Sequence, residues 1–332
     1  MKSSGSLVTV ASQVRPPVSR PLHSLLTLPV SAGPALNAYN DIQATFRTAC
    51  PETTPLTTPA EAILLIDSGH SHTTITPVLQ GRPLHPAIRR LDVGGKLLTN
   101  YLTRLLSVRH FDMRNDPYIV NEMKETACYV TLDFPSDLDK TWKGTRGERR
   151  PTYLSGSDGI AKDYVLPDSH TRFHGLVRDY DPSAAKARKG AVVAEDVLTL
   201  RNERFAVPEI LFHPRDIGMR QPGLGDLVMQ SLSALPVGLW PAMLANVVCV
   251  GGNTLFENFV QRLQTEILER VPDACIVRVA RPADPIVSTW TGAASFARHE
   301  HVERLAVTKQ EYEEHGAGWV ARKFATGLGA ES

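Results

Sequence analysis

One stretch in the last third of the chain constrains the fold more than any other, because an apolar run, a pair of glycines and an amphipathic segment follow one another. Residues 246–250 (NVVCV) have the composition of a buried strand, and residues 255–271 place apolar side chains on one helical face. Gly251 and Gly252 stand between them. A strand that leads through a glycine turn into a helix is typical of α/β proteins, so the sequence predicts this class with a mixed sheet.

The other regular elements are predicted by the same periodicities. Residues 62–67 (AILLID) and 73–78 (TTITPV) are apolar or β-branched and flank an Asp-Ser-Gly turn, which indicates a β-hairpin. Gly94 and Gly95 precede a helix with one apolar face. Further helices are expected over residues 117–129, 223–235, 285–297 and 308–324, and a further strand over residues 275–279.

The first sixty residues differ from the rest because eight of them are proline. Proline fixes φ and removes a backbone donor, so residues 1–60 are expected to be mostly irregular, with room for one short helix over residues 37–50. The basic, serine-containing stretch before Asp41 loosely matches an organelle transit peptide. The alternatives are a flexible tail or a misplaced start.

Residues 140–196 are rich in Gly, Arg, Lys, Ser and Asp and have little periodicity, which indicates a variable basic loop region broken by a short apolar segment at 164–166. Its basic side chains, among them Arg172 and Arg178, are either solvated or contact acidic partner surfaces or nucleosomal DNA. The expected organisation is a proline-rich segment (1–60), one α/β domain (61–325) and a tail (326–332).

Composition excludes several classes of protein. Lys plus Arg number 36 and Asp plus Glu 35, so no dominant field indicates a nucleic-acid binder. Four cysteines without repeated spacing exclude a disulfide scaffold, and Cys128 and Cys249 lie in apolar runs that suit buried thiols. No apolar run approaches the roughly 18 residues of a membrane-spanning helix.

Two glycine turns could hold a phosphate: Asp67-Ser68-Gly69, and the turn that begins with Gly251 and Gly252. Glycine lets backbone amides approach an anion, and the helix after the second turn adds partial positive charge. An aspartate in the first turn could hold a metal through water. Neither turn has a Walker or dinucleotide fingerprint, so each alone is better explained by a turn that needs positive φ.

Taken together with other segments, these turns resemble the actin family. Residues 64–102 resemble the second phosphate-binding hairpin of actin with the strand and helix that follow it. Residues 124–134 (KETACYVTLDF), 202–219 (NERFAVPEILFHPRDIGM), 246–267 and 307–316 (VTKQEYEEHG) resemble later actin segments in the same order. The runs VGGKLLTN (93–100), NEMKETACYV (121–130) and DYVLPD (163–168) are most similar to a nuclear branch of the actin-related proteins.

The resemblance implies an actin-like fold, the ribonuclease H-like or Hsp70-type ATPase fold, with nucleotide in a cleft between two halves. It also implies that this fold is incomplete, through truncation of the protein or of the gene model. No Asp-x-Gly hairpin precedes Asp67, so the first phosphate hairpin and the small outer subdomain after it are expected to be absent. The matching nucleotide-site residues are Asp67, Gly69, Lys124, Glu125, Gly251 and Gly252.

Departures from the family pattern weaken the implied site. His70 stands where nucleotide-hydrolysing actins have a second aspartate, Ser71 replaces a glycine, and Ile286 replaces a lysine that packs on the base. Histidine is a poor magnesium ligand. Loss of the first hairpin's amide contacts would cost on the order of 5 kcal/mol. We therefore expect no catalysis, and either no cofactor or weakly bound ATP.

For function, the resemblance implies a non-catalytic scaffold subunit of a nuclear SWR-type chromatin-remodelling complex, which exchanges a variant histone into nucleosomes. The expected partners are the remodelling ATPase, the RuvB-like helicases and a HIT-type zinc-finger subunit, with nucleosomes or histones contacted indirectly and no membrane. The expected location is the nucleus, and also the cytoplasm. The alternative is an actin-fold nucleotide-binding protein or weak ATPase of cytoskeletal type, which would need both hairpins and an acidic metal organiser.

Overall fold

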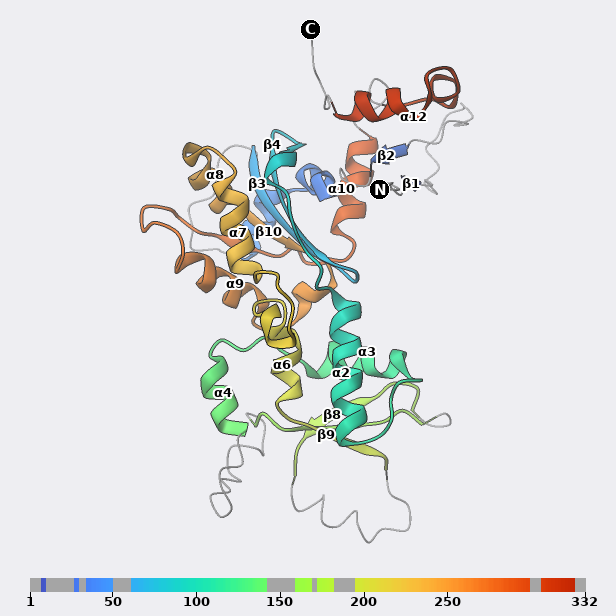
Figure 1. Cartoon of the computed structure of the whole chain (residues 1–332), viewed down its shortest axis with the longest axis vertical. Helices are drawn as coiled ribbons and strands as arrows, with labels where there is room; N and C mark the ends of the chain where they lie inside the picture. Colours follow the sequence, from blue (N-terminus) through green and yellow to red (C-terminus); the bar gives the residue numbers. More distant parts are fainter. Residues whose placement is uncertain are drawn as a thin grey trace.

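Most of the strands and helices form two units, which lie one above the other in Figure 1, while β1 (Leu7–Thr9), β2 (Thr27–Pro29) and α12 (Lys309–Ala325) belong to neither. The computed structural model describes residues 7–9, 27–29, 34–49, 61–141, 159–168, 172–181, 195–298 and 306–325. We call residues 34–49, 61–93 and 214–298 the six-strand unit, and the described residues between 94 and 213 the three-strand unit. The chain passes from the first unit to the second at residues 93–94 and returns at residues 213–214.

The sheet of the six-strand unit is mixed, as predicted. Its order is β11-β10-β3-β4-β5, with β6 also beside β4. β3 (Ala62–Ser68) and β4 (Thr73–Leu79) form the predicted antiparallel hairpin, whereas β10 (Val247–Val250) runs parallel to β3 and places Val250 opposite Asp67. The carboxyl ends of β3 and β10 therefore meet at one edge. The remaining strands are β5 (Arg82–Pro83), β6 (Arg89–Leu91) and β11 (Val279–Ala280).

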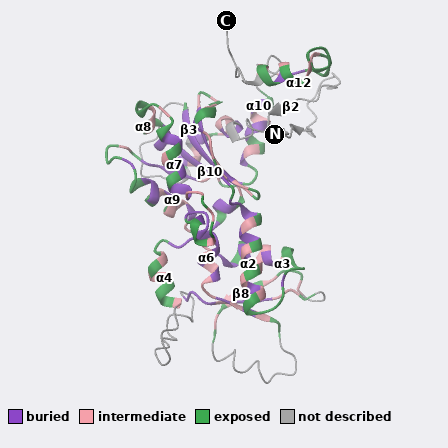
Figure 2. Cartoon of the chain, in the orientation of Figure 1, coloured by how far each residue is buried: buried purple, intermediate pink, exposed green. Residues whose placement is uncertain are grey.

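Side chains alternate between two cores on the faces of this sheet. Leu64 and Ile66 of β3 face the larger core, and Ile63 and Leu65 face the smaller one. The larger core also holds residues of α7 (Leu224–Ser233), α8 (Trp240–Leu244) and α9 (Phe259–Leu268). Figure 2 shows this burial along the strands and the inner helix faces.

The smaller core is covered by residues that precede the expected domain start. α1 (Ile42–Ala49) contributes Ile42 and Phe46, both at least 95% buried. The 3-10 helix η2 (Pro34–Tyr39) packs against α10 (Ser288–Ala297), where Ser288 donates to the buried Asn37 side chain at 2.7 Å. The short helix expected within residues 37–50 is thus confirmed, and it packs on the sheet.

The three-strand unit contains α2 (Gly95–Arg109), α3 (Pro117–Ala127), α4 (Phe134–Thr141), α6 (Glu203–Glu209) and the antiparallel sheet β8-β7-β9. β7 (Lys162–Val165) and β8 (Leu176–Asp179) lie within the stretch expected to be a loop, so that expectation is wrong for these segments. β7 pairs on both sides, with β9 (Val197–Leu200) as its other neighbour, and its Tyr164 is fully buried.

Two arginines of the expected basic loop region form ion pairs within the chain. Arg172 and Arg178 both form ion pairs with Glu195, at 3.5 and 2.7 Å. Their charge is thus partly neutralised within the chain. Seven further basic residues of the expected loop region lie outside the described residues: Lys143, Arg146, Arg149, Arg150, Lys186, Arg188 and Lys189.

Several helix boundaries differ from those that the hydrophobic periodicity predicts. α9 begins at Phe259 rather than near 255, because the chain first forms the 3-10 helix η7 (Gly252–Leu255) and then takes a left-handed φ of 64° at Asn258. α12 (Lys309–Ala325) is interrupted at Gly316, whose φ is 72°.

Among the described helices, none is both long enough and apolar enough to cross a membrane. The other short elements are β1 (Leu7–Thr9), β2 (Thr27–Pro29), η3 (His85–Ala87), η5 (Pro214–Ile217) and η6 (Val237–Leu239).

Candidate functional site

The candidate site lies where the β3–β4 hairpin meets two glycine turns. Gly251 has a φ of 92°, and a Cβ there would overlap the carbonyl oxygen of Ser68. A Cβ at Gly94 would lie 2.5 Å from the backbone nitrogen of His72. Glycine at both positions therefore allows backbone to pack directly on the hairpin.

The hairpin loop is bonded to the start of α2. The Gly95 amide donates to the Gly69 carbonyl at 3.0 Å, and the Lys96 amide donates to the His70 carbonyl at 2.8 Å. Within the loop, the Gly69 amide donates to the His72 carbonyl at 3.2 Å. Amides at a helix N-terminus often serve an anion, but these two amides of α2 serve the chain itself.

Asp67 is the second-last residue of β3 and lies beside Gly251, and burial is the one cause that shifts its pKa. Desolvation raises the pKa of the Asp67 carboxyl from 3.8 to about 6. Burial of a carboxylate without a compensating charge disfavours its ionised form. A cation or a hydrogen-bond donor at this edge would therefore be bound favourably by the ionised side chain.

Lys124 is engaged inside the three-strand unit. Its ammonium lies 3.3 Å from the Gly95 carbonyl, 3.1 Å from Thr99 Oγ1 and 2.8 Å from Asn121 Oδ1, and the residue is 3% exposed. Burial lowers the pKa of this lysine. Because an ammonium has three donors, these contacts use them all. Glu125 is exposed and accepts a bond from Asn121 Nδ2 at 2.8 Å.

Asp67, Gly69, Lys124 and Gly251 therefore gather around the start of α2, as their matched positions imply. Asn253 joins them: its amide nitrogen donates to the Gly69 carbonyl at 2.8 Å. Sequence reasoning placed Asn253 only in a turn. The available signal was a polar side chain directly after two glycines at a strand end, where a buried amide needs partners.

Gly69 and Gly252 differ from the other glycines of the site. A Cβ at Gly252 would meet nothing within 4 Å, and one at Gly69 would have its nearest neighbours at an ordinary 3.7 Å. The packing of the chain does not demand glycine at either position. Glu125 is the one matched residue whose side chain is exposed rather than engaged at the hairpin.

The described residues do not fit a tightly held nucleotide. Lys124 has no donor left for a phosphate or a ribose, and the first two amides of α2, those of Gly95 and Lys96, are occupied. Ile286, which stands in place of the base-packing lysine, is 63% exposed beside the Gly251 turn, whose amide bonds to Pro285 O. Burial raises the pKa of Asp67 to about 6 and so disfavours the ionised form, which is the form that would bind a cation.

The model of the actin family matches residues 24–325, and the chain therefore belongs to the actin family, with the actin-like fold that the resemblance implied. Over 300 residues the chain is 74% identical to actin-related protein 6 of Neurospora crassa, covering 90% of this chain and 66% of that protein.

More distant relatives agree. The chain is 48% identical over 309 residues to actin-like protein arp6 of Emericella nidulans, covering 90% of this chain and 64% of the relative. It is 35% identical over 279 residues to actin-related protein 6 of Arabidopsis thaliana, covering 79% and 63%. The chain is thus an actin-related protein of the actin-related protein 6 type, and it spans about two thirds of the length of these relatives.

Proposed function

We propose that the chain is a non-catalytic scaffold subunit of a nuclear SWR-type chromatin-remodelling complex, which exchanges a variant histone into nucleosomes. The observation that carries the proposal is the 74% identity to actin-related protein 6 over 90% of the chain. Its partners would be the remodelling ATPase, the RuvB-like helicases and a HIT-type zinc-finger subunit. The ATPase would supply the energy, and the chain would contact nucleosomes indirectly.

The geometry of the hairpin edge supports a role without catalysis. Phosphoryl transfer to water needs the nucleotide, its metal and the attacking water to be positioned together. Here the Lys124 ammonium uses its donors in bonds within the chain, and position 70 carries a histidine where the hydrolysing actins have a carboxylate. ATP, if bound, would be bound weakly.

Exposed apolar side chains support a role in binding other proteins. Tyr118 of α3 is 74% exposed, Phe173 is 77% exposed, and Trp290 of α10 is 59% exposed. Large aromatic side chains on a surface are frequent anchors of protein interfaces. A subunit held among several partners would cover such groups in the assembly.

Affinity purification from a fungal host that lacks its own actin-related protein 6 tests the proposal. The tagged chain is expected to recover the remodelling ATPase, the RuvB-like helicases and the zinc-finger subunit, identified by mass spectrometry. The same host with the tag alone is the control. Recovery of the chain without these proteins would contradict the proposal. Phosphate release from MgATP above the rate of an Asp67→Asn variant would favour the alternative, a weak ATPase.

A further inference from the structure

A chain of buried hydrogen bonds crosses the base of the β3–β4 hairpin. Asn253 Nδ2 lies 3.1 Å from Ser68 Oγ, Ser68 Oγ lies 2.9 Å from Thr73 Oγ1, and Thr73 Oγ1 lies 2.9 Å from the Val93 carbonyl oxygen. All four residues are at least 95% buried. The chain of bonds therefore joins the turn after β10, both strands of the hairpin and the segment that enters α2.

In this chain of hydrogen bonds, which we call the relay, the donor and the acceptor of every bond follow from the groups that it joins. The Val93 carbonyl can only accept, so the single hydroxyl proton of Thr73 points to it. Ser68 must then donate to Thr73, and Asn253 must donate to Ser68. The second amide proton of Asn253 goes to the Gly69 carbonyl at 2.8 Å, which also fixes the orientation of the amide group.

We infer that Asn253 is a positioning residue that holds the hairpin against α2 without any nucleotide. The inference deepens the proposed scaffold function, on which it rests, because it explains how the hairpin edge keeps its shape in a subunit that does not turn over ATP. Gly69 O accepts from both Asn253 and the Gly95 amide, so the loop is held from the β10 turn and from the helix at once. Bonds of this kind reinforce one another in a buried network.

The relay also lies where the chain passes between the two units. Val93 is the last residue of the six-strand unit before Gly94 and Gly95 lead into α2. Lys124 holds the Gly95 carbonyl from the other side, at 3.3 Å. Asn253 and Lys124 therefore hold the two sides of this crossing, through the Gly69 carbonyl and the Gly95 carbonyl.

Hydrogen exchange of the full chain tests the inference through three backbone amides, those of Gly69, Gly95 and Lys96, which close the loop and bind it to α2. Asn253→Asp keeps the size of the side chain but removes both donated bonds. It is expected to speed exchange at these amides about tenfold or more, and amides of the β7–β9 sheet should not change. Asn115→Asp, in an exposed turn, is the matched control and should leave all three unchanged.

A second variant and a measurement with added MgATP complete the test. Thr73→Val preserves shape and breaks the bond to Val93, so it should speed exchange at the same amides even if Asn253→Asp fails to fold. Millimolar MgATP added to the unaltered chain should leave their exchange unchanged. Unchanged exchange in the variants, or about tenfold protection by MgATP, would overturn the inference. Because exchange is measured on the isolated chain, this result is independent of whether the chain recovers its proposed partners.

Discussion

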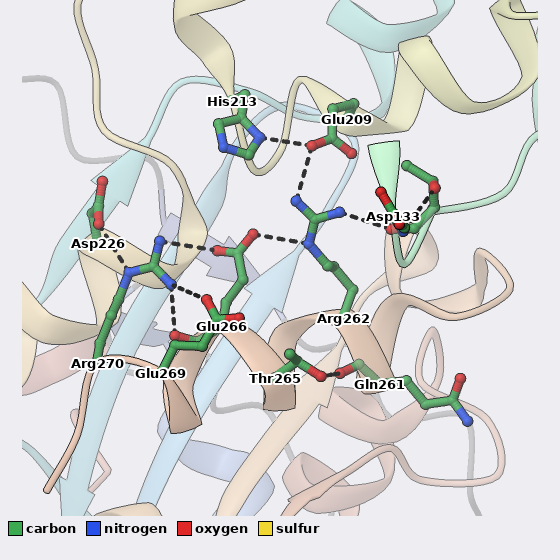
Figure 3. Close-up of polar contacts among 11 residues, drawn as sticks. Asp133, Glu209, His213, Asp226, Gln261, Arg262, Thr265, Glu266, Glu269 and Arg270 are labelled. Carbon is green, nitrogen blue, oxygen red and sulfur yellow. Dashed lines mark hydrogen bonds and ion pairs between the residues drawn. The ribbon is translucent and has the colours of Figure 1, made fainter. Parts of the chain in front are cut away.

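Replacing Arg262 with methionine should destabilise the chain strongly, because this side chain connects the two units through buried ionic contacts (Figure 3). Arg262 lies on α9 and is 12% exposed. It pairs with Glu209 of α6 at 3.0 Å, pairs with Glu266 at 3.0 Å and donates to the Thr131 carbonyl at 2.8 Å. Its guanidinium also lies 5.2 Å from the centroid of the Phe212 ring.

The size of the effect follows from the two carboxylates left behind. Glu209 and Glu266 have side-chain exposures of 3% and 8%, so neither can be solvated in place of the arginine. Removing one member of a buried ion pair typically costs about 3–5 kcal/mol. For a chain of 332 residues, 1 kcal/mol shifts the melting temperature by about 1.4 °C, so the melting temperature should fall by roughly 4–7 °C. His213 and Arg270 remain as weaker supports, at 2.6 Å from Glu209 and 3.7 Å from Glu266.

Thermal and urea unfolding of purified variants measure this change. Arg90→Met is the control, because the Arg90–Asp92 pair is more than half exposed and its loss should cost about 1 kcal/mol or less. The double variant Arg262→Met with Glu209→Gln should recover part of the loss, since it no longer buries that unpaired charge. Stability of Arg262→Met within about 1 kcal/mol of the unaltered chain would refute the reasoning.

Three further results are expected. Because burial raises the pKa of Asp67 to about 6, the folded chain takes up this proton before the unfolded chain does as pH falls. The contribution of Asp67 to stability should therefore rise by up to about 3 kcal/mol from neutral pH to about pH 4, and the difference in stability between the unaltered chain and Asp67→Asn in urea titrations should change by that amount. The bond to Glu209 raises the pKa of His213, so its stabilisation is complete below about pH 6.5 and is lost as pH rises through the raised pKa; His213→Gln should flatten this part of the profile. Gly94→Ala should lower the melting temperature by several degrees because its Cβ would meet the hairpin backbone at 2.5 Å, whereas Gly238→Ala, where a Cβ meets nothing within 4 Å, should not; equal melting temperatures would contradict the packing argument.

Strong periodicity made much of the fold predictable from sequence. The β3–β4 hairpin, β10, α2, α3, α7 and α10 are confirmed, because each carries an unbroken apolar pattern or a glycine boundary. β7 was missed because it is four residues long and includes the buried Asp163, which accepts from Thr199 at 2.7 Å. A polar residue of this kind is predicted to lie in a loop, because its partner on the neighbouring strand is not evident from the sequence.

The site was partly predictable for a related reason. Family resemblance located Asp67, Lys124 and Gly251, which the structure brings together. The resemblance did not identify Asn253 as a donor, because Asn253 bonds to Ser68 and Gly69, which precede it in the chain by 185 and 184 positions. Arg262 likewise reads as a solvated position of an amphipathic helix, and its burial depends on α6 packing against it. Such roles arise from tertiary contacts that no local pattern records.

Variant-histone occupancy of chromatin tests the central claim most directly, in a fungal host that lacks its own actin-related protein 6. The scaffold account predicts that the chain restores occupancy, and that Asp67→Asn restores it equally, because no step of the exchange uses nucleotide turnover by this subunit. Loss of occupancy with Asp67→Asn, while that variant still recovers the remodelling ATPase, would contradict a non-catalytic role. Failure of the unaltered chain to restore occupancy would contradict the proposed complex.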